Sequence, residues 1–589
     1  MNSPRFPVGA KPLAVALMSC LSPLAWSAGA EVPVIAISSQ GTSNANSAEA
    51  NDASVIFYNP AGMSRLRGTN VSAAFAMIAA TAKVEDMGTT RLQDMGQTPD
   101  TGNSANCSVY DCMSAANPNP AMPAVRDQPE GLFPAVLPVA ALFGTTPLSE
   151  NVTLGIGIFS PGGGNLNYKK DWFGRHFIDS AAIETVNINP SLAIRFDDKH
   201  SIGVGVSALV GHAKFKLQID VNKVAPYLLA GVLDSSDSVI EALLGSQTSL
   251  LGQLGLGGLL NSLGLGSEGL LGQVANGLTS ALPNEVSGLL ASLLAGQGLP
   301  GLGGLNSALA GVSLIDPTST AAGQVNVFGF GYGWNVGYMY QFSDKTRLGV
   351  SYRSESDIRM NGKLDWDFTD ARTSALGNAL IGNLEDFLVQ YYRPDTDARV
   401  IFTIPAKLNV GFFTELSDKL DFMLNYTFNK TSVVNNVTAE LPHQGSRADL
   451  KAKQGNVVLT QNWRDTFTLA AGLNYHWSDK LTLRTGIQFD QTPVPSSRYR
   501  HPALADNDRW MASLGLGYRV NRNTTIDAAY SYLYIMPSES NNHDPCSGVW
   551  FEGSTAQSPS ECTSNGGTFR ARYYDSHAHI LGLQFNQRF

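Results

Sequence analysis

Much of this chain alternates apolar and polar residues with a period of two. In residues 481–490, Leu, Leu, Thr, Ile and Phe are interleaved with Thr, Arg, Gly, Gln and Asp. The same alternation recurs in residues 347–353, 509–520 and 526–534. Because successive side chains of a strand point to opposite faces, each segment has one apolar and one polar face as a β-strand. The pattern predicts a large sheet of two-faced strands.

Aromatic residues stand near the ends of several of these segments. Examples are Trp477, Trp510, Tyr518, Tyr534 and the terminal Phe589. Soluble sandwiches also contain two-faced strands, but aromatic girdles at the strand ends are typical of membrane barrels. About fourteen segments have the roughly 9–11 residues that a tilted membrane strand needs. We therefore predict an all-β fold, a transmembrane antiparallel β-barrel of residues 68–589.

The composition supports this fold and excludes others. Charged residues make up only 15% of the 589 residues, and the formal net charge is −9; ordinary soluble domains carry about 25% charged residues. A bundle of membrane helices needs repeated runs of about 20 apolar residues, whereas hydrophobic residues reach only 43% here. Nucleic-acid binding needs clusters of Lys and Arg. Since the sequence has no basic tract, we expect no nucleic-acid partner.

The first 30 residues have the organisation of a secretory signal peptide. Arg5 and Lys11 precede an apolar stretch that ends near Trp26, and the small residues 28–30 follow. We expect cleavage near residue 30. The alternative is a lipoprotein signal ending at Cys20, although the apolar stretch continues beyond that cysteine.

Removal of this signal leaves four cysteines in an exported chain. They form two close pairs in polar, turn-rich segments: Cys107 with Cys112, and Cys546 with Cys562. We expect two local disulfides that pin loops. A metal site is the alternative, but the paired CxxC spacing and nearby histidines are missing. We therefore expect neither a metal nor another cofactor.

Two segments depart from the strand pattern early in the chain. Residues 31–67 are small and polar and precede the first strand near Val71; they form either a disordered leader or a plug inside the barrel. Further on, an alternating strand stops at Ser160 and Pro161, and residues 162–164 are all glycine. Proline removes a ladder donor and glycine weakens a strand. This stretch is either an ordinary hairpin loop or a break in the barrel wall.

The third departure is a Leu/Gly/Ser-rich insert, roughly residues 221–322. Between Glu241 and Asp316 its only charged residues are Glu268 and Glu285. Residues 286–294 have helical spacing behind a capping asparagine, but glycine is frequent elsewhere. We interpret the insert as an extracellular loop of short amphipathic helices, whose remaining apolar surface receives oily ligands. The alternative is a low-complexity spacer packed against itself.

An ordered set of short motifs resembles one known family. In chain order they are Asn59-Pro60-Ala61-Gly62-Met63, Phe133-Pro134-Ala135, Ser160-Pro161-Gly162, Asn187-Ile188-Asn189-Pro190-Ser191, Phe330-Gly331-Tyr332-Gly333-Trp334-Asn335, Ser351-Tyr352-Arg353-Ser354 and Thr492-Pro493-Val494-Pro495. Together they resemble the FadL/TodX (OmpP1) family of outer-membrane transporters for long-chain fatty acids and hydrocarbons. The resemblance spans nearly the whole mature chain outside the insert.

The resemblance implies a fold, a location and a mode of action. It implies a monomeric, multi-pass barrel of fourteen strands in the outer membrane of a Gram-negative bacterium. It also implies a luminal hatch with Asn59, Pro60 and Ala61, and an inward kink in the third strand at Ser160 to Gly164. The expected function is passive uptake of a fatty acid, alkane or monoaromatic compound. Such a ligand is captured at the surface, bound in the lumen and released sideways into outer-membrane lipid.

A fatty acid would need a cation near its carboxylate. We predict Arg464 for this role, because it shares the inward parity of Thr466 and Thr468, and Lys216 as the second candidate. The alternative for both is a solvated charge in the lumen that balances nearby acids. Family members place an arginine after an Ala-Lys pair where this chain has Lys216 and a leucine, so their headgroup recognition does not transfer directly.

Two other functions were weighed against uptake of hydrophobic compounds. A general diffusion porin for small polar solutes would have an open lumen without a hatch. An outer-membrane hydrolase would need a nucleophile and a base, but the chain has no GxSxG, HExxH or Walker lysine motif. His577 and His579 alone do not make a catalytic group. We therefore expect no enzymatic activity.

Overall fold

The computed structural model describes residues 34–89, 130–132, 135–168, 172–219, 319, 321–372, 396–440, 452–453, 457–544, 550–551 and 567–589. The predicted signal peptide and most of the insert of residues 221–322 lie outside the described residues. The four cysteines of the two predicted disulfides also lie outside them.

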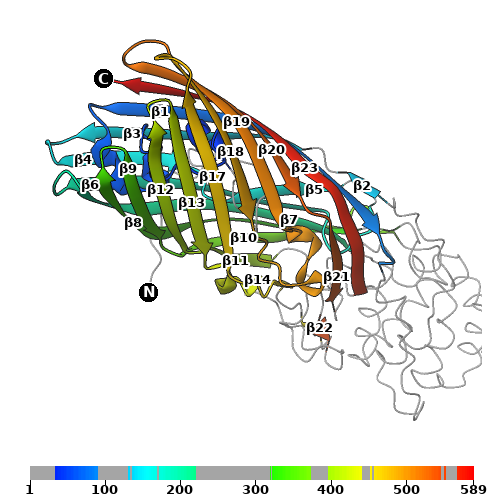
Figure 1. Cartoon of the computed structure of the whole chain (residues 1–589). Coiled ribbons are helices and arrows are strands. Elements are labelled where there is room, and N and C mark those ends of the chain that lie inside the picture. The colour runs from blue at the N-terminus through cyan, green and yellow to red at the C-terminus, as the bar shows by residue number, and fades with distance from the viewer. Residues whose placement is uncertain are drawn as a thin grey trace, which may run out of the picture.

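Fourteen antiparallel strands close into a barrel, which confirms the predicted fold (Figure 1). In order around the barrel they are β1 (Asn70–Asp86), β3 (Ala135–Pro147), β4 (Val152–Phe159) with β5 (Gly163–Asn167), β6 (Ser180–Arg195), β7 (His200–Ile219), β8 (Ala321–Ser343), β9 (Thr346–Arg353) with β10 (Ser356–Asp367), β12 (Lys407–Ser417) with β11 (Thr396–Ile404), β13 (Leu420–Asn429) with β14 (Asn436–Glu440), β17 (Thr466–His476) with β16 (Val457–Thr460), β18 (Leu481–Asp490), β19 (Arg509–Arg519), β20 (Thr524–Ile535) with β21 (Ser538–Asp544), and β23 (Gly567–Arg588). Strand β23 pairs with β1 along nearly its whole length and closes the barrel.

The remaining elements are short. β2 (Glu130–Leu132) extends the β1 edge, and β15 (Ala452–Lys453) pairs with β22 (Trp550–Phe551). The short helices are α2 (Ile37–Gln40), α3 (Val55–Tyr58), and the 3-10 turns η1 (Pro60–Arg65), η3 (Thr431–Val433), η5 (Ser497–Tyr499) and η6 (Pro502–Leu504). In the part of the chain that the structure describes, no helix is long and apolar enough to cross a membrane.

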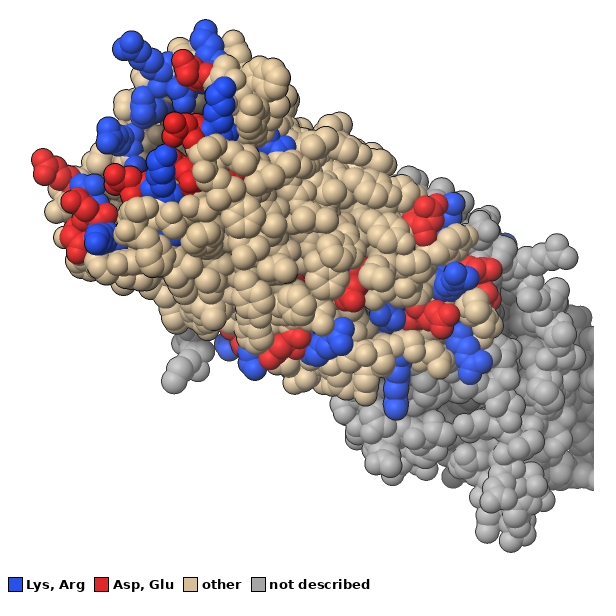
Figure 2. All heavy atoms as spheres, viewed as in Figure 1, with Lys and Arg blue, Asp and Glu red and all other residues tan. Residues whose placement is uncertain are grey.

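The barrel wall has an apolar outer face, and its inner face is mixed, with many polar side chains. On β20, Tyr530 is 38% exposed, whereas its neighbours Asp527 and Ser531 are 1% and 0% exposed. Figure 2 shows a band almost free of charged side chains around the visible wall, between two ends where charges gather. The sequence predicted this alternation, because hydrocarbon outside the wall favours apolar side chains and the lumen favours polar ones.

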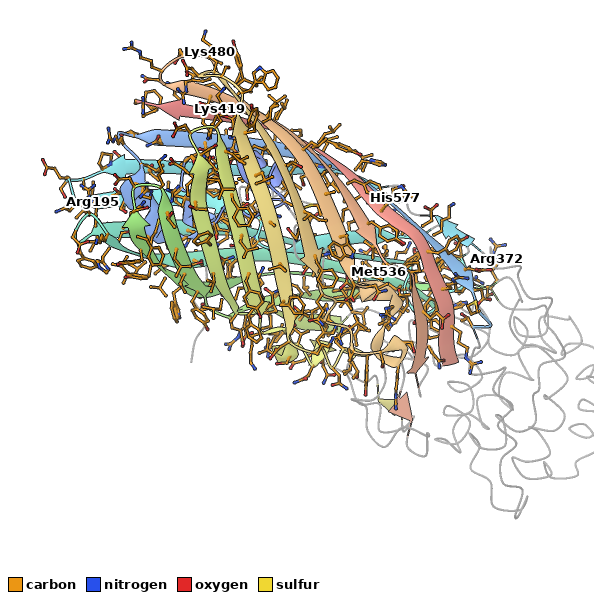
Figure 3. All side chains as sticks on the ribbon, viewed as in Figure 1. Arg195, Arg372, Lys419, Lys480, Met536 and His577 are labelled. Carbon is orange, nitrogen blue, oxygen red and sulfur yellow. The ribbon has the colours of Figure 1, made fainter. Side chains whose placement is uncertain are left out.

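The two ends of the barrel differ in the length of their connections. At one end, short turns join consecutive strands, such as β6 to β7 and β17 to β18. Arg195, Lys419 and Lys480 lie at this end, and Arg372 lies at the opposite end (Figure 3). Short turns are typical of the periplasmic side of such barrels. We therefore name the short-turn end periplasmic and the other end extracellular.

Among the described residues the interior holds two large apolar clusters and a small one of Ala45, Ala48, Phe413, Met423 and Ala470. The periplasmic core contains Ile37, Ile56 and Met63 from residues 34–66, packed against barrel residues such as Phe143 and Phe159. The extracellular core is built around the rings of Tyr168, Trp172, Phe173, Phe177 and Phe569, together with inward side chains of the strands. The lumen is therefore packed with side chains at both levels.

Candidate functional site

The third strand of the barrel is interrupted between β4 and β5. Pairing with β6 runs to Phe159↔Asn187 and resumes at Gly163↔Glu184. Four steps on the third strand thus face three steps on β6, so one residue is extra, as in a β-bulge. Ser160, Pro161 and Gly162 between these points belong to no strand and are buried.

Side chains replace the backbone ladder across this interruption. The amide of Gly162 donates to Thr185 Oγ1 at 3.3 Å, and Thr185 Oγ1 in turn donates to the Gly162 carbonyl. Ser160 Oγ donates to the same carbonyl at 3.1 Å. The amide and the carbonyl of Gly162 therefore have hydrogen-bond partners although regular pairing stops. The predicted kink residues Gly163 and Gly164 lie just beyond, at the start of β5.

The interruption leaves residues 135–141 of β3 without a paired strand on one side among the described residues. β3 pairs with β4 only from Leu142↔Ile158 to Pro147↔Thr153. Its residues 135–141 pair with β1, and no pairing between β3 and β5 occurs among the described residues. Pro138 lies within this stretch, where a strand edge tolerates proline. We call residues 160–164 together with the free edge of residues 135–141 the wall break.

Residues 34–66 lie inside the barrel and bind strands around its circumference. Side chains, carbonyls and backbone amides of this segment form hydrogen bonds with Ser72, Ser201, Tyr338, Arg347, Ser351, Asn425, Asn474, Gln488, Ser513, Ser531 and Gln584. These residues come from ten strands, from β1 to β23. The segment therefore crosses the lumen at the level of the periplasmic core.

The Asn59-Pro60-Ala61 motif fixes this segment against β7 and β8. Asn59 Oδ1 accepts from the Ala61 amide at 3.1 Å and caps η1, and Pro60 occupies the first turn, which needs no N–H donor. Asn59 Nδ2 donates to the Tyr338 carbonyl at 3.1 Å. A Cβ at Gly203 would overlap the backbone of Pro60 and Ala61. Glycine at position 203 therefore permits the close approach.

Several charges are buried beside residues 34–66. The carboxylate of Glu49 accepts from Asn474 Nδ2 at 2.6 Å, and burial raises the pKa of Glu49 despite the opposing attraction of Arg484. The guanidinium of Arg347 donates to the carbonyls of Ala48 and Glu49. Arg484 forms an ion pair with Asp527 at 2.6 Å. The docking of this segment thus depends on polar contacts as well as on apolar packing.

The two predicted carboxylate-binding cations lie near the extracellular end. Lys216 Nζ is 3.5 Å from Asp179 Oδ2, so its charge is already paired. Arg464 is exposed, and its Nε donates to the Thr492 carbonyl at 3.2 Å. The strand alternation from which the inward direction of Arg464 was predicted does not extend to this residue, because residues 461–465 lie between β16 and β17. A role of Arg464 or Lys216 in carboxylate binding stays a prediction.

A different cation faces the interior beside the wall break. Arg353, the last residue of β9, lies 5.5 Å from the Phe159 ring centroid and 5.3 Å from that of Phe57, measured from its guanidinium carbon. The alternation of residues 347–353 places Arg353 on the polar face of its strand, but no motif gave it a role. Strand alternation predicts that the Arg353 side chain points inwards. It does not predict the contacts with Phe57 and Phe159, because these residues are far from Arg353 in the chain.

Comparisons with known proteins agree with this architecture. The model of a family described as outer membrane protein transport protein (OMPP1/FadL/TodX) matches residues 18–589. The chain is 24% identical over 555 residues to an outer membrane protein of Neisseria meningitidis serogroup B, with 94% of this chain and 93% of that protein covered. It is 26% identical over 209 residues to the long-chain fatty acid transport protein of Escherichia coli O6:H1, with 35% and 42% covered.

The same fold occurs in a solved structure. The crystal structure of a Pseudomonas aeruginosa FadL homologue matches with a TM-score of 0.63 at 19% sequence identity, covering 95% of this chain and 100% of that chain. The barrel fold and the family match over residues 18–589 agree. This chain belongs to the OMPP1/FadL/TodX family of outer membrane transport proteins, located in the outer membrane of a Gram-negative bacterium.

Proposed function

We propose that this protein takes up hydrophobic molecules across the outer membrane by passive diffusion. In this proposal the ligand is captured at the extracellular end, binds among apolar side chains in the lumen, and leaves sideways through the wall break into outer-membrane lipid. The candidate ligands are long-chain fatty acids, alkanes and monoaromatic hydrocarbons. The protein acts as a monomer, and no step of the route involves a cofactor or a chemical reaction.

The observation that carries this proposal is the missing ladder between β3 and β5. On its other side β3 pairs with β1 from Ala135 to Thr145, so the gap lies only on the side that faces β5. An acyl chain gains about 0.8 kcal/mol for each CH₂ group removed from water, so a route between apolar surfaces is favoured over a water-filled pore. Phe143 and Phe159 stack at the wall break with ring centroids 5.8 Å apart, and Phe57 meets Phe159 at 5.0 Å. These rings are buried at 1% exposure for Phe143 and 0% for Phe159, so in this proposal apolar side chains fill the exit and move aside when a ligand passes.

Residues 34–66 supply the second part of the proposal. They cross the lumen at the periplasmic core and hydrogen-bond to strands on all sides. In this position they oppose a straight path to the periplasm and direct a ligand towards the wall. We propose that they act as a hatch whose small movement connects the lumen to the wall break. The apolar composition of the insert makes residues 221–322 our candidate surface for initial capture.

Uptake by purified protein in liposomes tests the proposal. We expect the protein to accelerate entry of labelled oleate or of toluene, and to leave liposome swelling in arabinose at the rate of protein-free vesicles. Rapid swelling in arabinose without oleate or toluene entry would overturn the proposal and favour a general diffusion porin. Release of free fatty acid from phospholipid would instead indicate a hydrolase.

A further inference from the structure

Two histidines lie side by side on the outer face of β23. His577 and His579 are separated by one residue, so on a strand their side chains point the same way. The next residues of this row, Leu581 and Leu583, are 62% and 60% exposed and face lipid. His577 lies at the outside of the barrel wall (Figure 3). The two imidazole rings therefore belong to the outer surface of the barrel and not to the lumen.

A β-bulge precedes the two histidines. Pairing of β23 with β1 passes from Thr81↔His577 to Lys83↔Tyr574, so three steps on β23 face two steps on β1. Asp575 in the bulge has a φ of 48°, in the left-handed region that residues with a side chain seldom adopt. Its carboxylate forms an ion pair with Lys83 Nζ at 2.7 Å. Backbone strain of this kind persists where surrounding contacts hold it, and it is frequent at functional sites.

The bulge brings hydrogen-bond acceptors to the first histidine. His577 Nδ1 lies 3.2 Å from the Asp575 carbonyl oxygen and 3.5 Å from Asp575 Oδ1. A carbonyl oxygen only accepts, so Nδ1 of His577 carries the proton of this hydrogen bond. In the neutral ring the free lone pair is then on Nε2. The bulge therefore selects the tautomer in which Nε2 of His577 is available as a metal ligand.

A tyrosine positions the second histidine. The Tyr530 hydroxyl on β20 lies 2.8 Å from His579 Nδ1. A hydroxyl both donates and accepts, so it can accept from Nδ1 and leave the lone pair of Nε2 for a ligand. Tyr532 packs against both imidazoles, with its ring centroid 5.8 Å from that of His577 and 5.4 Å from that of His579. Histidines that bind metals are oriented in this way, by a hydrogen bond of the other ring nitrogen.

The separation of the two rings suits a single metal ion. Their centroids are 5.5 Å apart and their planes are inclined at 85°. An ion bound to two Nε2 atoms at about 2.0–2.1 Å lies roughly 3 Å from each centroid and joins rings whose centroids are about 5 Å apart. Imidazole suits Cu²⁺ and Zn²⁺, whereas Mg²⁺ and Ca²⁺ need oxygen ligands. No group of three or more His, Cys, Asp or Glu side chains is placed to hold a metal among the described residues, so this site has two protein ligands.

We propose that His577 and His579 bind one divalent transition-metal ion, Cu²⁺ or Zn²⁺, on the outer surface of the barrel. The ligands are the two Nε2 atoms, and water fills the remaining coordination positions. Asp575 and Tyr530 are positioning residues that act through the histidines. The sequence-based expectation of no metal was drawn from the cysteines, and this site uses none of them. Because the site lies outside the lumen, it does not depend on the proposed uptake.

Titration of the purified barrel with Cu²⁺ and with Zn²⁺ tests the site. The barrel is kept in detergent and carries no histidine tag. We expect one high-affinity ion per barrel, with Cu²⁺ bound more tightly than Zn²⁺ and not displaced by excess Mg²⁺. His577→Ala and His579→Ala should each lower the Cu²⁺ affinity at least tenfold. Tyr530→Phe removes the positioning hydroxyl and should lower the Cu²⁺ affinity about tenfold.

His200→Ala is the matched control. His200 Nδ1 also lies beside a tyrosine hydroxyl, that of Tyr338 at 2.7 Å. Residues 198 and 202, which would share its face of the strand, are not histidines. The geometry of a single histidine next to a tyrosine is thus kept, without the second ligand. This variant should change the Cu²⁺ affinity less than twofold.

Electron paramagnetic resonance of the Cu²⁺-loaded wild-type barrel gives a readout that no variant can disturb. Its spectrum should show coupling to two imidazole nitrogens, and the spectra of His577→Ala and His579→Ala should show coupling to one. Failure of the wild type to bind Cu²⁺ and Zn²⁺ would overturn the site. So would an unchanged Cu²⁺ affinity in the folded double variant, or an equal loss of affinity in His200→Ala. The histidines would then serve only as interfacial rings packed on Tyr532.

Discussion

Two walls of the barrel are built from the same kind of two-faced strand but differ in continuity. Pairing between β18 and β19 runs without interruption from Leu481↔Tyr518 to Asp490↔Arg509. Pairing between β3 and β4 stops at Leu142↔Ile158, and β5 then pairs only with β6. The continuous wall ends in a buried ion pair of Arg509 with Asp490, whereas at the broken wall the hydroxyl of Thr185 on β6 bonds both the amide and the carbonyl of Gly162.

This difference separates stability from transport. A continuous ladder with a buried ion pair holds two strands in a single register. At the broken wall, β6 continues on both sides of the interruption and keeps the barrel closed, so the gap needs only local side-chain compensation. We therefore expect changes in the continuous wall to affect folding and changes in the broken wall to affect uptake.

The largest effect is expected from Asp490→Asn in the continuous wall. Asp490 accepts hydrogen bonds from Arg509 and from Thr468 Oγ1. Loss of its charge removes the carboxylate that is ion-paired with the buried Arg509, which should lower the free energy of unfolding by about 3 kcal/mol. Chemical denaturation in detergent measures this. Oleate uptake per folded molecule should stay the same. A loss of uptake per folded molecule would contradict the view that the continuous wall serves folding and the broken wall serves uptake.

The next largest expected effect is a loss of oleate uptake when the broken wall is closed. Replacing Gly162 and Gly163 together by valine favours extended backbone and a longer ladder. We expect oleate uptake to fall at least tenfold while the barrel remains folded, as judged by its heat-dependent mobility on gels. The matched control places valines at Ala512 and Ala528 in the continuous wall and should have normal uptake. Normal uptake in the folded Gly162→Val, Gly163→Val variant would exclude exit at this point.

Displacing residues 34–66 should have a moderate effect on permeability. In Gly203→Val the new side chain would overlap Pro60 and Ala61, so the segment has to move away from β7. Liposome swelling in arabinose should then rise severalfold. Val206→Leu, a lipid-facing change on the same strand, serves as control. An unchanged swelling rate in Gly203→Val would show that this segment does not restrict the lumen.

The smallest expected effect is a change of arabinose leakage with pH. Burial raises the pKa of Glu49 above its ordinary value of 4.5, so the docked segment holds a proton more readily than the undocked one. Docking is therefore strongest at low pH and weakens as pH rises from 4.5 through the raised pKa. Arabinose leakage should increase modestly with pH over this range. In Glu49→Gln that increase should vanish; persistence of the same increase would assign it to another group.

The sequence predicted the barrel and its lipid-facing surface because strand alternation is a local property. It also located the proline and glycines where the third strand leaves the ladder. Arg464 was placed inwards because alternation was extended across residues 461–465, which are not in a strand. The surroundings of Arg353 depend on Phe57, Phe159 and Ser207, which only the closed barrel brings together. No local sequence pattern predicts these contacts.

Site-specific photo-crosslinking tests the sideways exit most directly. The photoreactive residue p-benzoyl-phenylalanine would replace Leu142, at the last β3–β4 pair, or Leu424 on β13, half-way round the barrel; both side chains face lipid and are 45% and 39% exposed. Labelled oleate is added to cells for a short pulse before illumination. The proposed route predicts several times more adduct at Leu142 than at Leu424, and loss of this excess when Gly162 and Gly163 are valine. Equal labelling at the two positions from the earliest times would contradict exit through the wall break.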